Sequence, residues 1–346
     1  MLRNKSYIYL QKVSTELGIA MKEDVSFHDV LEANKRIKSS VFRTPLYHSV
    51  AVSKRIGVET YLKLECFQLT GAFKIRGAIN KIRSLSKSEL RKGLVTASSG
   101  NHGLAVAYAA KLHGVKATIV VPENAVEEKI RAIKGYGAEV IKYGRNYDEA
   151  YVKALEIQKE SGGTFVHPFN DPFIIAGQGT IGLELLEDIP DVDTIIVPVG
   201  GGGLISGVSI AAKTLKPNIK IVGVQPEGAP AVYLSWKAGK IVEVNSIKTV
   251  ADGLAAKKPL ELTFKIIKRY VDKILLVSDK EIGKAVLTLL NLVHVLAEPS
   301  GAASTAALLF RYKPKPKEKV AVIVTGANIS INYLASLLKK PPKPTV

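Results

Sequence analysis

One lysine in a glycine-flanked stretch has the setting of a reactive amine. Residues 70–78 read Thr-Gly-Ala-Phe-Lys-Ile-Arg-Gly-Ala, so that Lys74 follows Phe73. The alternating residues 61–65 before it are typical of a strand, and residues 77–82 after it are typical of a helix. An amine desolvated by Phe73 near a helix start would have a lowered pKa and could act as a nucleophile, including as a Schiff-base former. The alternative is an ordinary solvated lysine, and this stretch alone does not decide between the two.

A second chemical signal is a run of four glycines: Gly200, Gly201, Gly202 and Gly203. They stand between a β-branched run at 194–199 and an apolar, helix-like run at 204–215. Without Cβ atoms the backbone can turn its N–H groups inward, and a helix N-terminus adds a positive dipole end, which together favour a phosphate site. The spacing matches neither the dinucleotide fingerprint nor a nucleotide P-loop. The alternative is a tight strand-to-helix turn, for which four glycines are costly in conformational entropy.

Two polar turns follow other strand-like runs. The first turn, after residues 94–97, contains four polar side chains: Ser98, Ser99, Asn101 and His102. Hydroxyl and N–H groups of this kind suit a carboxylate. The second turn begins at Thr325 after residues 320–324, at the carboxyl end of a strand, where open α/β sheets place ligands. For both turns the alternative interpretation is an ordinary helix start with a capping residue.

The composition is that of a soluble globular protein. The chain has 346 residues, which is enough for two domains, with 47% hydrophobic and 23% charged residues. Its 49 Lys and Arg residues exceed its 31 Asp and Glu residues, for a net charge of +18. The basic residues are scattered singly, which is typical of a solvated surface rather than a nucleic-acid footprint. We therefore expect no nucleic-acid partner, whereas anionic small molecules suit this charge.

Several classes of protein are disfavoured by other features. The single cysteine, Cys66, excludes an intramolecular disulfide and a cysteine-built metal site. Charged residues such as Arg3, Lys5 and Glu16 interrupt the N-terminus, which therefore lacks the apolar core of a signal peptide. No apolar run is long enough to cross a bilayer. We expect a cytoplasmic protein without a membrane partner.

Alternating strand-like and helix-like runs predict an α/β fold with parallel sheets covered by helices on both faces. Ser26 and Asp29 have capping-box spacing and predict a helix start. Strands are expected at 60–64, 94–97, 117–121, 139–143, 194–199, 219–224 and 320–324. Helices are expected at 104–113, 125–136, 147–159, 181–187, 204–215 and 280–296, and Gly-Gln-Gly-Thr at 177–180 precedes the helix at 181–187.

A reactive lysine, a phosphate cradle and a carboxylate turn together suit pyridoxal phosphate, which needs an amine for its aldehyde, a phosphate anchor and room for an amino acid. Further distinctive segments are His-Pro-Phe-Asn at 167–170, Ala-Gly-Gln-Gly-Thr at 176–180, Ala-Asp-Gly at 251–253 and Glu-Pro at 298–299. From about residue 25 to 338, the chain resembles the serine/threonine dehydratase family of fold-type II pyridoxal-phosphate enzymes. The resemblance implies two open, twisted, mostly parallel sheets, similar to the tryptophan synthase β subunit, with the cofactor in the cleft between two domains.

The resemblance also implies a domain division and site residues. The expected parts are an extension at 1–24, a discontinuous large domain at 25–80 and 170–340, a small domain at 93–168 and a tail at 341–346. Lys74 would hold the cofactor as a Schiff base and move the Cα proton, and Ser99 would act as acid or base on the opposite face. Implied cofactor contacts are Phe73, Lys74, Asn101, Gly200, Gly201, Gly202, Gly203, Glu298 and Thr325. Implied substrate contacts are Ser98, Ser99, Asn101, His102 and Asn170.

The reaction implied is β-elimination of water from L-threonine or L-serine, giving 2-oxobutanoate or pyruvate and ammonia. A neutral hydroxyl from Thr325 at the ring nitrogen favours elimination over transamination. The sequence does not rank threonine against serine, because one methyl group is worth only ~1–3 kcal/mol in a pocket. Alternatives are a serine racemase, which Ser99 allows, or a 3-hydroxyaspartate dehydratase. A different class of alternative is a non-catalytic protein that binds pyridoxal phosphate or nucleic acid.

Two further expectations come from the resemblance. Serine racemase and some relatives bind a divalent metal through acidic side chains after one strand, where this chain has Gln225 and Ala231. We therefore expect no tight Mg²⁺ or Ca²⁺ site. A homodimer is usual in the family and is expected here.

Overall fold

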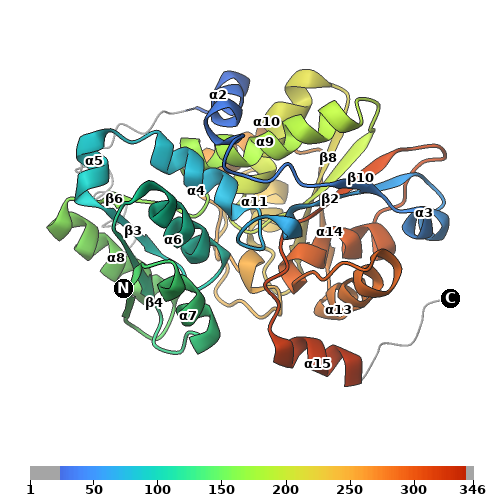
Figure 1. Cartoon of the computed structure of the whole chain (residues 1–346). Helices are drawn as coiled ribbons and strands as arrows, with labels where there is room; N and C mark the ends of the chain where they lie inside the picture. The colour runs from blue at the N-terminus through green and yellow to red at the C-terminus, as the bar shows by residue number, and fades with distance from the viewer. Residues whose placement is uncertain (1–23, 340–346) are drawn as a thin grey trace.

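The computed structural model describes residues 24–339, so most of the predicted extension and the predicted tail lie outside the described residues. The described chain forms two sheets that lie side by side, each surrounded by helices (Figure 1). This arrangement confirms the expected α/β fold with two mostly parallel sheets.

Within residues 24–339, the larger sheet has six strands, in spatial order β1 (Leu46–His48), β2 (Thr60–Leu64), β10 (Val320–Val324), β7 (Thr194–Pro198), β8 (Lys220–Pro226) and β9 (Lys273–Val277). The smaller sheet of the same region has four, in the order β5 (Glu139–Lys142), β4 (Ala117–Val121), β3 (Leu94–Ala97) and β6 (Thr164–Phe165). Neighbouring strands pair in parallel, except for the antiparallel edge strand β1 against β2.

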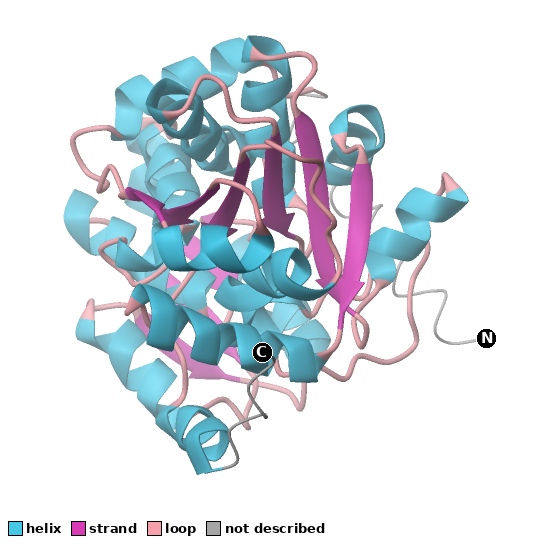
Figure 2. Ribbon diagram, turned by 90° about the vertical axis from the view of Figure 1, so that its right-hand side faces the viewer, coloured by secondary structure: helices cyan, strands magenta, loops and turns pink. Residues whose placement is uncertain are grey.

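Helices cover both faces of the strands (Figure 2). In chain order they are α2 (Phe27–Ile37), α3 (Val50–Ile56), α4 (Lys74–Arg83), α5 (Lys87–Lys92), α6 (Asn101–His113), α7 (Glu127–Gly135), α8 (Tyr147–Ser161), α9 (Pro172–Asp188), α10 (Gly203–Leu215), α11 (Ala231–Ala238), α12 (Glu261–Tyr270), α13 (Asp279–Thr288), α14 (Pro299–Phe310) and α15 (Ile331–Lys339). Short helical turns are η1 (Glu65–Phe67), η2 (Asp252–Leu254) and the π-helical turn η3 (Leu289–Val293).

The predicted helix starts and strands are mostly confirmed. Ser26 and Asp29 form the predicted capping box of α2. Strands β2, β3, β4 and β10 have the bounds that the sequence predicts. Lys74 is the first residue of α4, directly after the turn that follows β2 and η1. The local signals therefore suffice to place the candidate lysine at a helix start.

The helix expected at 181–187 is longer than predicted, because residues 177–180 also lie inside α9 (Pro172–Asp188). The helix begins earlier, where Asp171 accepts hydrogen bonds from the first turn. The glycines in this segment allow close packing between helices. A Cβ atom on Gly177 would lie 2.7 Å from the Cα of Gly77 in α4, and one on Gly179 would lie 2.9 Å from a carbonyl oxygen in α10. The two glycines therefore let α9 approach the helices on either side of it.

The helix expected at 280–296 is shorter than predicted. Helix α13 ends at Thr288, and the chain then makes one π-helical turn, η3. His294 ends that turn in the left-handed conformation, with φ of 58°. The residues of η3 are as apolar as those at the end of α13, so the sequence does not mark the change of geometry.

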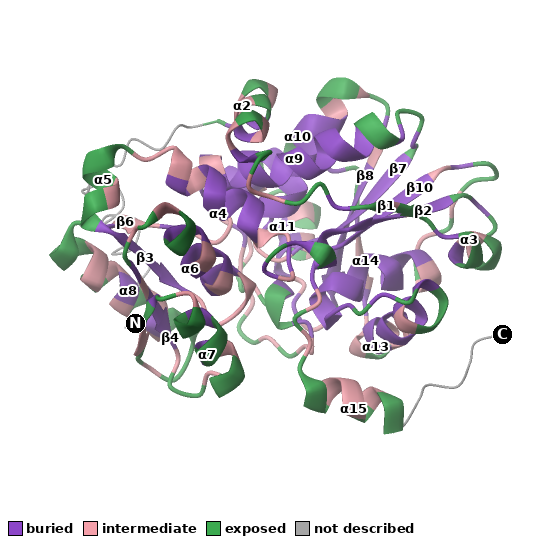
Figure 3. Ribbon diagram, viewed as in Figure 1, coloured by how far each residue is buried: buried purple, intermediate pink, exposed green. Residues whose placement is uncertain are grey.

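Apolar cores lie on both faces of the larger sheet and around the smaller sheet (Figure 3). Ile75, Ile79 and Ile82 of α4 pack in the core of the smaller sheet. The same helix packs against α9 through Gly77. Helix α4 thus packs against both the core of the smaller sheet and α9. No break in the core therefore marks the predicted domain boundary near residue 80, and the domain division stays a prediction.

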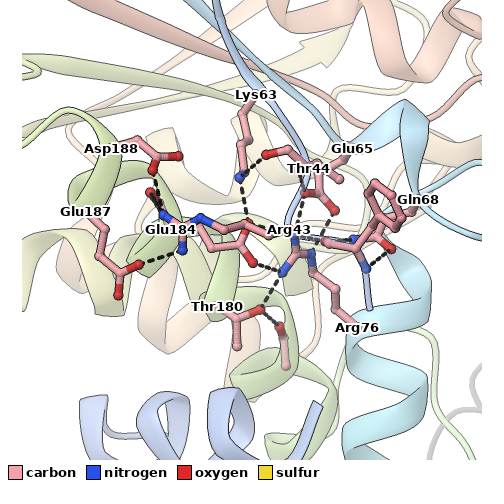
Figure 4. A network of polar contacts seen from close by, with 12 residues as sticks. Arg43, Thr44, Lys63, Glu65, Gln68, Arg76, Thr180, Glu184, Glu187 and Asp188 are labelled. Carbon is pink, nitrogen blue, oxygen red and sulfur yellow. Dashed lines mark hydrogen bonds and ion pairs between the residues drawn. The ribbon is translucent and has the colours of Figure 1, made fainter. Parts of the chain in front are cut away.

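A buried network of charged side chains lies next to the lysine turn (Figure 4). The guanidinium of Arg76, two residues after Lys74, donates to both carboxylate oxygens of Glu65 at 2.8 Å. It also donates to Glu184 of α9 at 2.6 and 2.9 Å. Lys63 of β2 donates to Glu184 at 2.6 Å, which balances two cations against two carboxylates. The network ties β2, η1, α4 and α9 together.

Candidate active site

A single cleft of about 2880 Å³ brings together residues from the turns of both sheets. Every residue predicted for the site lines it: Phe73, Lys74, Ser98, Ser99, Asn101, His102, Asn170, Gly200, Gly201, Gly202, Gly203, Glu298 and Thr325. These residues come from segments up to 250 positions apart, so only the fold assembles them. Their individual roles stay predictions.

Lys74 has the desolvated surroundings that the sequence predicts. Its Nζ atom donates a hydrogen bond to the carbonyl oxygen of Pro168 at 2.9 Å and lies 5.2 Å from the centre of the Phe73 ring. Desolvation lowers the pKa of the Lys74 amine to about 8, although the nearby Glu298 carboxylate opposes this shift. About a tenth of the amine is therefore neutral, and nucleophilic, at pH 7, far more than for an ordinary lysine.

The lysine turn is joined to the turn that begins at Thr325. Backbone N–H groups of Phe73 and Ala327 donate to carbonyl oxygens of Thr325 and Gly71 at 3.1 and 2.8 Å. The Thr325 side chain is buried, with 3% of the residue exposed, and its hydroxyl donates to the Ser300 carbonyl oxygen at 3.4 Å. A neutral hydroxyl is thus fixed beside the lysine turn.

The glycine loop connects β7 to α10. Gly202 caps the helix in the left-handed conformation, with φ of 98°. A Cβ atom on Gly201 would lie 2.5 Å from the ring of Phe169, and one on Gly203 would lie 2.9 Å from the same residue. The N–H groups of the first turn of α10 have no partner within the helix. Close packing with Phe169 and free N–H groups both agree with an anion site at this loop.

His167 holds the Phe169 segment in place. Its Nδ1 atom accepts hydrogen bonds from the backbone N–H groups of Phe169 and Asn170 at 3.2 and 2.8 Å. Desolvation lowers the pKa of His167 to about 3, so the ring is neutral and keeps the lone pair that both bonds need. The Asn170 side chain accepts a bond from Thr263 at the start of α12, at 3.4 Å. The sequence contained the His-Pro-Phe-Asn segment, but gave no role to His167 or Phe169.

The Ser-Ser-Gly-Asn-His turn leads into α6, whose first N–H groups lack helical partners. The Ser98 hydroxyl accepts from the Gly100 N–H at 3.2 Å, and Ser99 lies next to it in the cleft. His102 donates from Nε2 to the Val166 carbonyl oxygen at 2.9 Å, and desolvation lowers its pKa to about 3. Its buried Nδ1 therefore carries a lone pair and has no partner. The His102 imidazole therefore has no further N–H to donate to a carboxylate at this turn.

Glu298 is a buried carboxyl group in the cleft, with 6% of the residue exposed. It accepts a hydrogen bond from Nδ2 of Asn101 at 2.6 Å, and Oδ1 of Asn101 accepts one from Asn328 at 2.7 Å. Burial, helped by the nearby Asp252 carboxylate, raises the pKa of Glu298 to about 7. Asn328, three residues after Thr325, has no role among the residues predicted for the site.

Comparison with known proteins agrees with this geometry. Residues 37–326 match the family described as pyridoxal-phosphate dependent enzymes. An L-threonine ammonia-lyase of Thermotoga maritima is 48% identical over 316 residues, which cover 91% of this chain and 79% of that enzyme. The chain belongs to the pyridoxal-phosphate-dependent enzyme family.

Solved structures of the family have the same fold. A maize serine racemase superposes with a TM-score of 0.87 at 41% identity, covering 91% of this chain and 97% of that one. The processed form of threonine deaminase isoform 2 from Solanum lycopersicum gives a TM-score of 0.87 at 35% identity, covering 92% of this chain and 91% of that one. The resemblance to fold-type II enzymes is therefore confirmed.

The residues of the cleft fit pyridoxal phosphate. The amine of Lys74 is desolvated and lies in the same cleft as the glycine loop, whose helix N-terminus suits a phosphate group. The buried Thr325 hydroxyl and the Asn101 amide line the same cleft and offer polar partners for the cofactor ring. This donor set has one group for each polar part of the cofactor.

Gln225 occupies one of the positions that carry an acidic metal ligand in serine racemase, and the chain is also expected to have no membrane-spanning segment. Gln225 is fully buried, and its side-chain oxygen accepts the Tyr233 N–H at 2.8 Å, while its Nε2 has no partner. Among residues 24–339, no group of three or more His, Cys, Asp or Glu side chains could hold a metal ion. The absence of a tight Mg²⁺ site stays a prediction. In the same range, no helix is both long and apolar enough to cross a membrane.

Replacing Gly201 with alanine is expected to weaken cofactor binding about tenfold, because the new methyl group would lie 2.5 Å from the Phe169 ring and force the loop to move. Equilibrium dialysis of the holoenzyme measures the dissociation constant. Gly135→Ala is the control, since a Cβ there would meet open space. An unchanged dissociation constant for Gly201→Ala would show that the glycine loop does not hold the cofactor.

The rate at which the cofactor-free protein captures pyridoxal phosphate is expected to rise tenfold per pH unit up to about pH 8 and then level off. Below the pKa of Lys74 the amine is protonated and cannot attack, whereas above it the amine is neutral. The change in cofactor absorbance after mixing measures this rate. A rise that continues towards pH 10.5 would mean that Lys74 is an ordinary solvated lysine.

Proposed function

We propose that this chain is an ammonia-lyase that uses pyridoxal phosphate to remove water from L-threonine or L-serine. The products are a 2-oxo acid, 2-oxobutanoate or pyruvate, and ammonia. The 48% identity to an L-threonine ammonia-lyase over 91% of the chain supports this activity. The observation that carries the proposal is the cleft itself. The desolvated Lys74, the glycine loop and the Ser-Ser-Gly-Asn-His turn all line it.

When bound, pyridoxal phosphate supplies an aldehyde carbon for the substrate amine and a ring that withdraws electrons from Cα. The neutral amine of Lys74 then removes the Cα proton. The Lys74 ammonium formed in this way would give that proton to the departing β-hydroxyl, which would leave as water, and the released enamine would tautomerise and hydrolyse to the 2-oxo acid and ammonia. The backbone N–H groups at Asn101 and His102 bind the substrate carboxylate, and the glycine loop binds the cofactor phosphate. Thr325 offers a neutral hydroxyl to the ring nitrogen.

Ser99 supports racemisation of serine as a second activity. It lies on the turn of the smaller sheet that lines the cleft, whereas Lys74 belongs to the turn that follows the larger sheet. A hydroxyl on the face opposite Lys74 could return a proton to Cα with inverted configuration. The 41% identity to a maize serine racemase points in the same direction.

A substrate panel tests these proposals. Purified holoenzyme is given L-threonine, L-serine, D-serine and 3-hydroxyaspartate, and release of the 2-oxo acid is measured. Release of the 2-oxo acid from L-threonine or L-serine supports the lyase. Release that is faster from 3-hydroxyaspartate than from each of the other substrates would reassign the substrate. D-serine formed from L-serine, and lost in Ser99→Ala while elimination persists, would establish racemisation. A yellow protein without any turnover would instead support a binding role.

We further infer a homodimer in the cytoplasm. Large apolar side chains are exposed near the lysine turn, including Phe42, Phe67 and Leu69, each at least 44% exposed. A second copy of the chain would cover such residues. Light scattering after size-exclusion chromatography measures the mass, and a monomer at micromolar concentration would contradict the dimer.

A further inference from the structure

Asn328 joins three of the turns that surround the cleft. Its side-chain Nδ2 donates to the carbonyl oxygen of Thr70 at 2.9 Å and to Oδ1 of Asn101 at 2.7 Å. Thr70 belongs to the lysine turn, Asn101 begins α6 beside the smaller sheet, and Asn328 follows β10 of the larger sheet. One amide group therefore spans both sides of the cleft.

These contacts fix the orientation of the Asn101 amide. The Thr70 carbonyl oxygen can only accept, so the atom of Asn328 that faces it must be the NH₂ group. That NH₂ group can only donate, so the atom of Asn101 that meets it must be the oxygen. The NH₂ group of Asn101 is then turned inward, where it donates to Glu298 at 2.6 Å. The backbone of the lysine turn thus decides which end of Asn101 faces the cleft.

The lysine turn also leaves space for the Asn328 side chain. Gly71 has a φ of 70°, and a Cβ atom there would lie 2.6 Å from Oδ1 of Asn328. Any side chain at this position would displace the Asn328 amide. The N–H of Ala327 donates to the Gly71 carbonyl oxygen at 2.8 Å, which fixes the distance between the two turns. The geometry is therefore specific to an asparagine opposite a glycine.

We propose that Asn328 is a positioning residue that holds the Asn101 amide with its NH₂ group directed into the cleft, towards the cofactor that Asn101 is expected to contact. Asn328 itself need not touch the cofactor or the substrate, because it acts through Asn101. The inference rests on the proposed use of pyridoxal phosphate, and on the contact between Asn101 and this cofactor that the family resemblance implies.

The variants Asn328→Ala and Asn328→Asp test this role. Aspartate keeps the size of the side chain but cannot donate, and its carboxylate would repel the oxygens of Thr70 and Asn101. The cofactor dissociation constant of the holoenzyme, measured by equilibrium dialysis, is expected to rise about tenfold in Asn328→Ala and at least as much in Asn328→Asp. Asn218→Asp, at an exposed loop position, adds the same charge far from the cleft and is the control.

A double-mutant cycle shows whether Asn328 acts through Asn101. If it does, Asn101→Ala combined with Asn328→Ala binds the cofactor no more weakly than Asn101→Ala alone. Fully additive losses would overturn the proposal, as would an Asn328→Asp variant within twofold of the wild type. The binding measurement needs no substrate, so it stands even if the panel shows no lyase activity. Because Asn328 is exposed, unfolding midpoints close to that of the wild type are expected for its variants.

Discussion

Replacing Lys74 with alanine is expected to reduce kcat/KM for L-threonine or L-serine by at least about 10³-fold, because general base and nucleophilic catalysis at one group are lost together. The visible absorbance of the lysine-bound cofactor should disappear in the same variant. Steady-state release of the 2-oxo acid and the absorption spectrum of the purified protein measure the two effects.

Lys92→Ala is the matched control for Lys74→Ala. Lys92 lines the same cleft but is exposed, so its removal changes the charge of the cleft without touching the lysine turn. We expect kcat/KM within about threefold of the wild type for this control. Turnover retained in Lys74→Ala would defeat the central assignment, whereas equal losses in both variants would indicate an effect of cleft charge.

The sequence predicts much of this site because each part has a local signal. A strand followed by glycines, or by small hydroxyl residues, and then by a helix start marks a turn at the carboxyl end of a strand. Parallel pairing of the strands brings such turns to one edge. Lys74, the glycine loop and Thr325 can all be found in this way, and the structure places them around one cleft.

Other features depend on partners far away in the chain and have no local signal. The sequence suggested that His102 could bind a carboxylate, but its tautomer depends on a carbonyl oxygen at Val166. The sequence does not show that α9 extends through its glycines, because the helices against which these glycines pack are unknown before folding. Asn328 gains its role from the lysine turn, some 250 residues earlier. In each case the missing information is a tertiary contact, not a residue preference.

Arg76→Met is expected to lower the free energy of unfolding by about 3–5 kcal/mol, because it leaves two carboxylates and only one cation in a buried network. Arg76, Glu65 and Lys63 are each 0% exposed, so water cannot replace the lost hydrogen bonds. Chemical denaturation of the holoenzyme measures the change, with the cofactor kept in constant excess. A loss of this size is a large part of the stability of an ordinary domain.

Arg43→Ala provides a matched control from the same region (Figure 4). Arg43 pairs with Glu187 and Asp188 at 2.7 and 2.5 Å, but its side chain is 50% exposed, so its loss should cost less than about 1 kcal/mol. Adding Glu65→Gln to Arg76→Met should recover part of the stability, since Lys63 and Glu184 then remain as a balanced pair. The glutamine can still accept the hydrogen bond that Thr44 donates to position 65. If the double variant were less stable than Arg76→Met alone, unbalanced charge would not explain the loss.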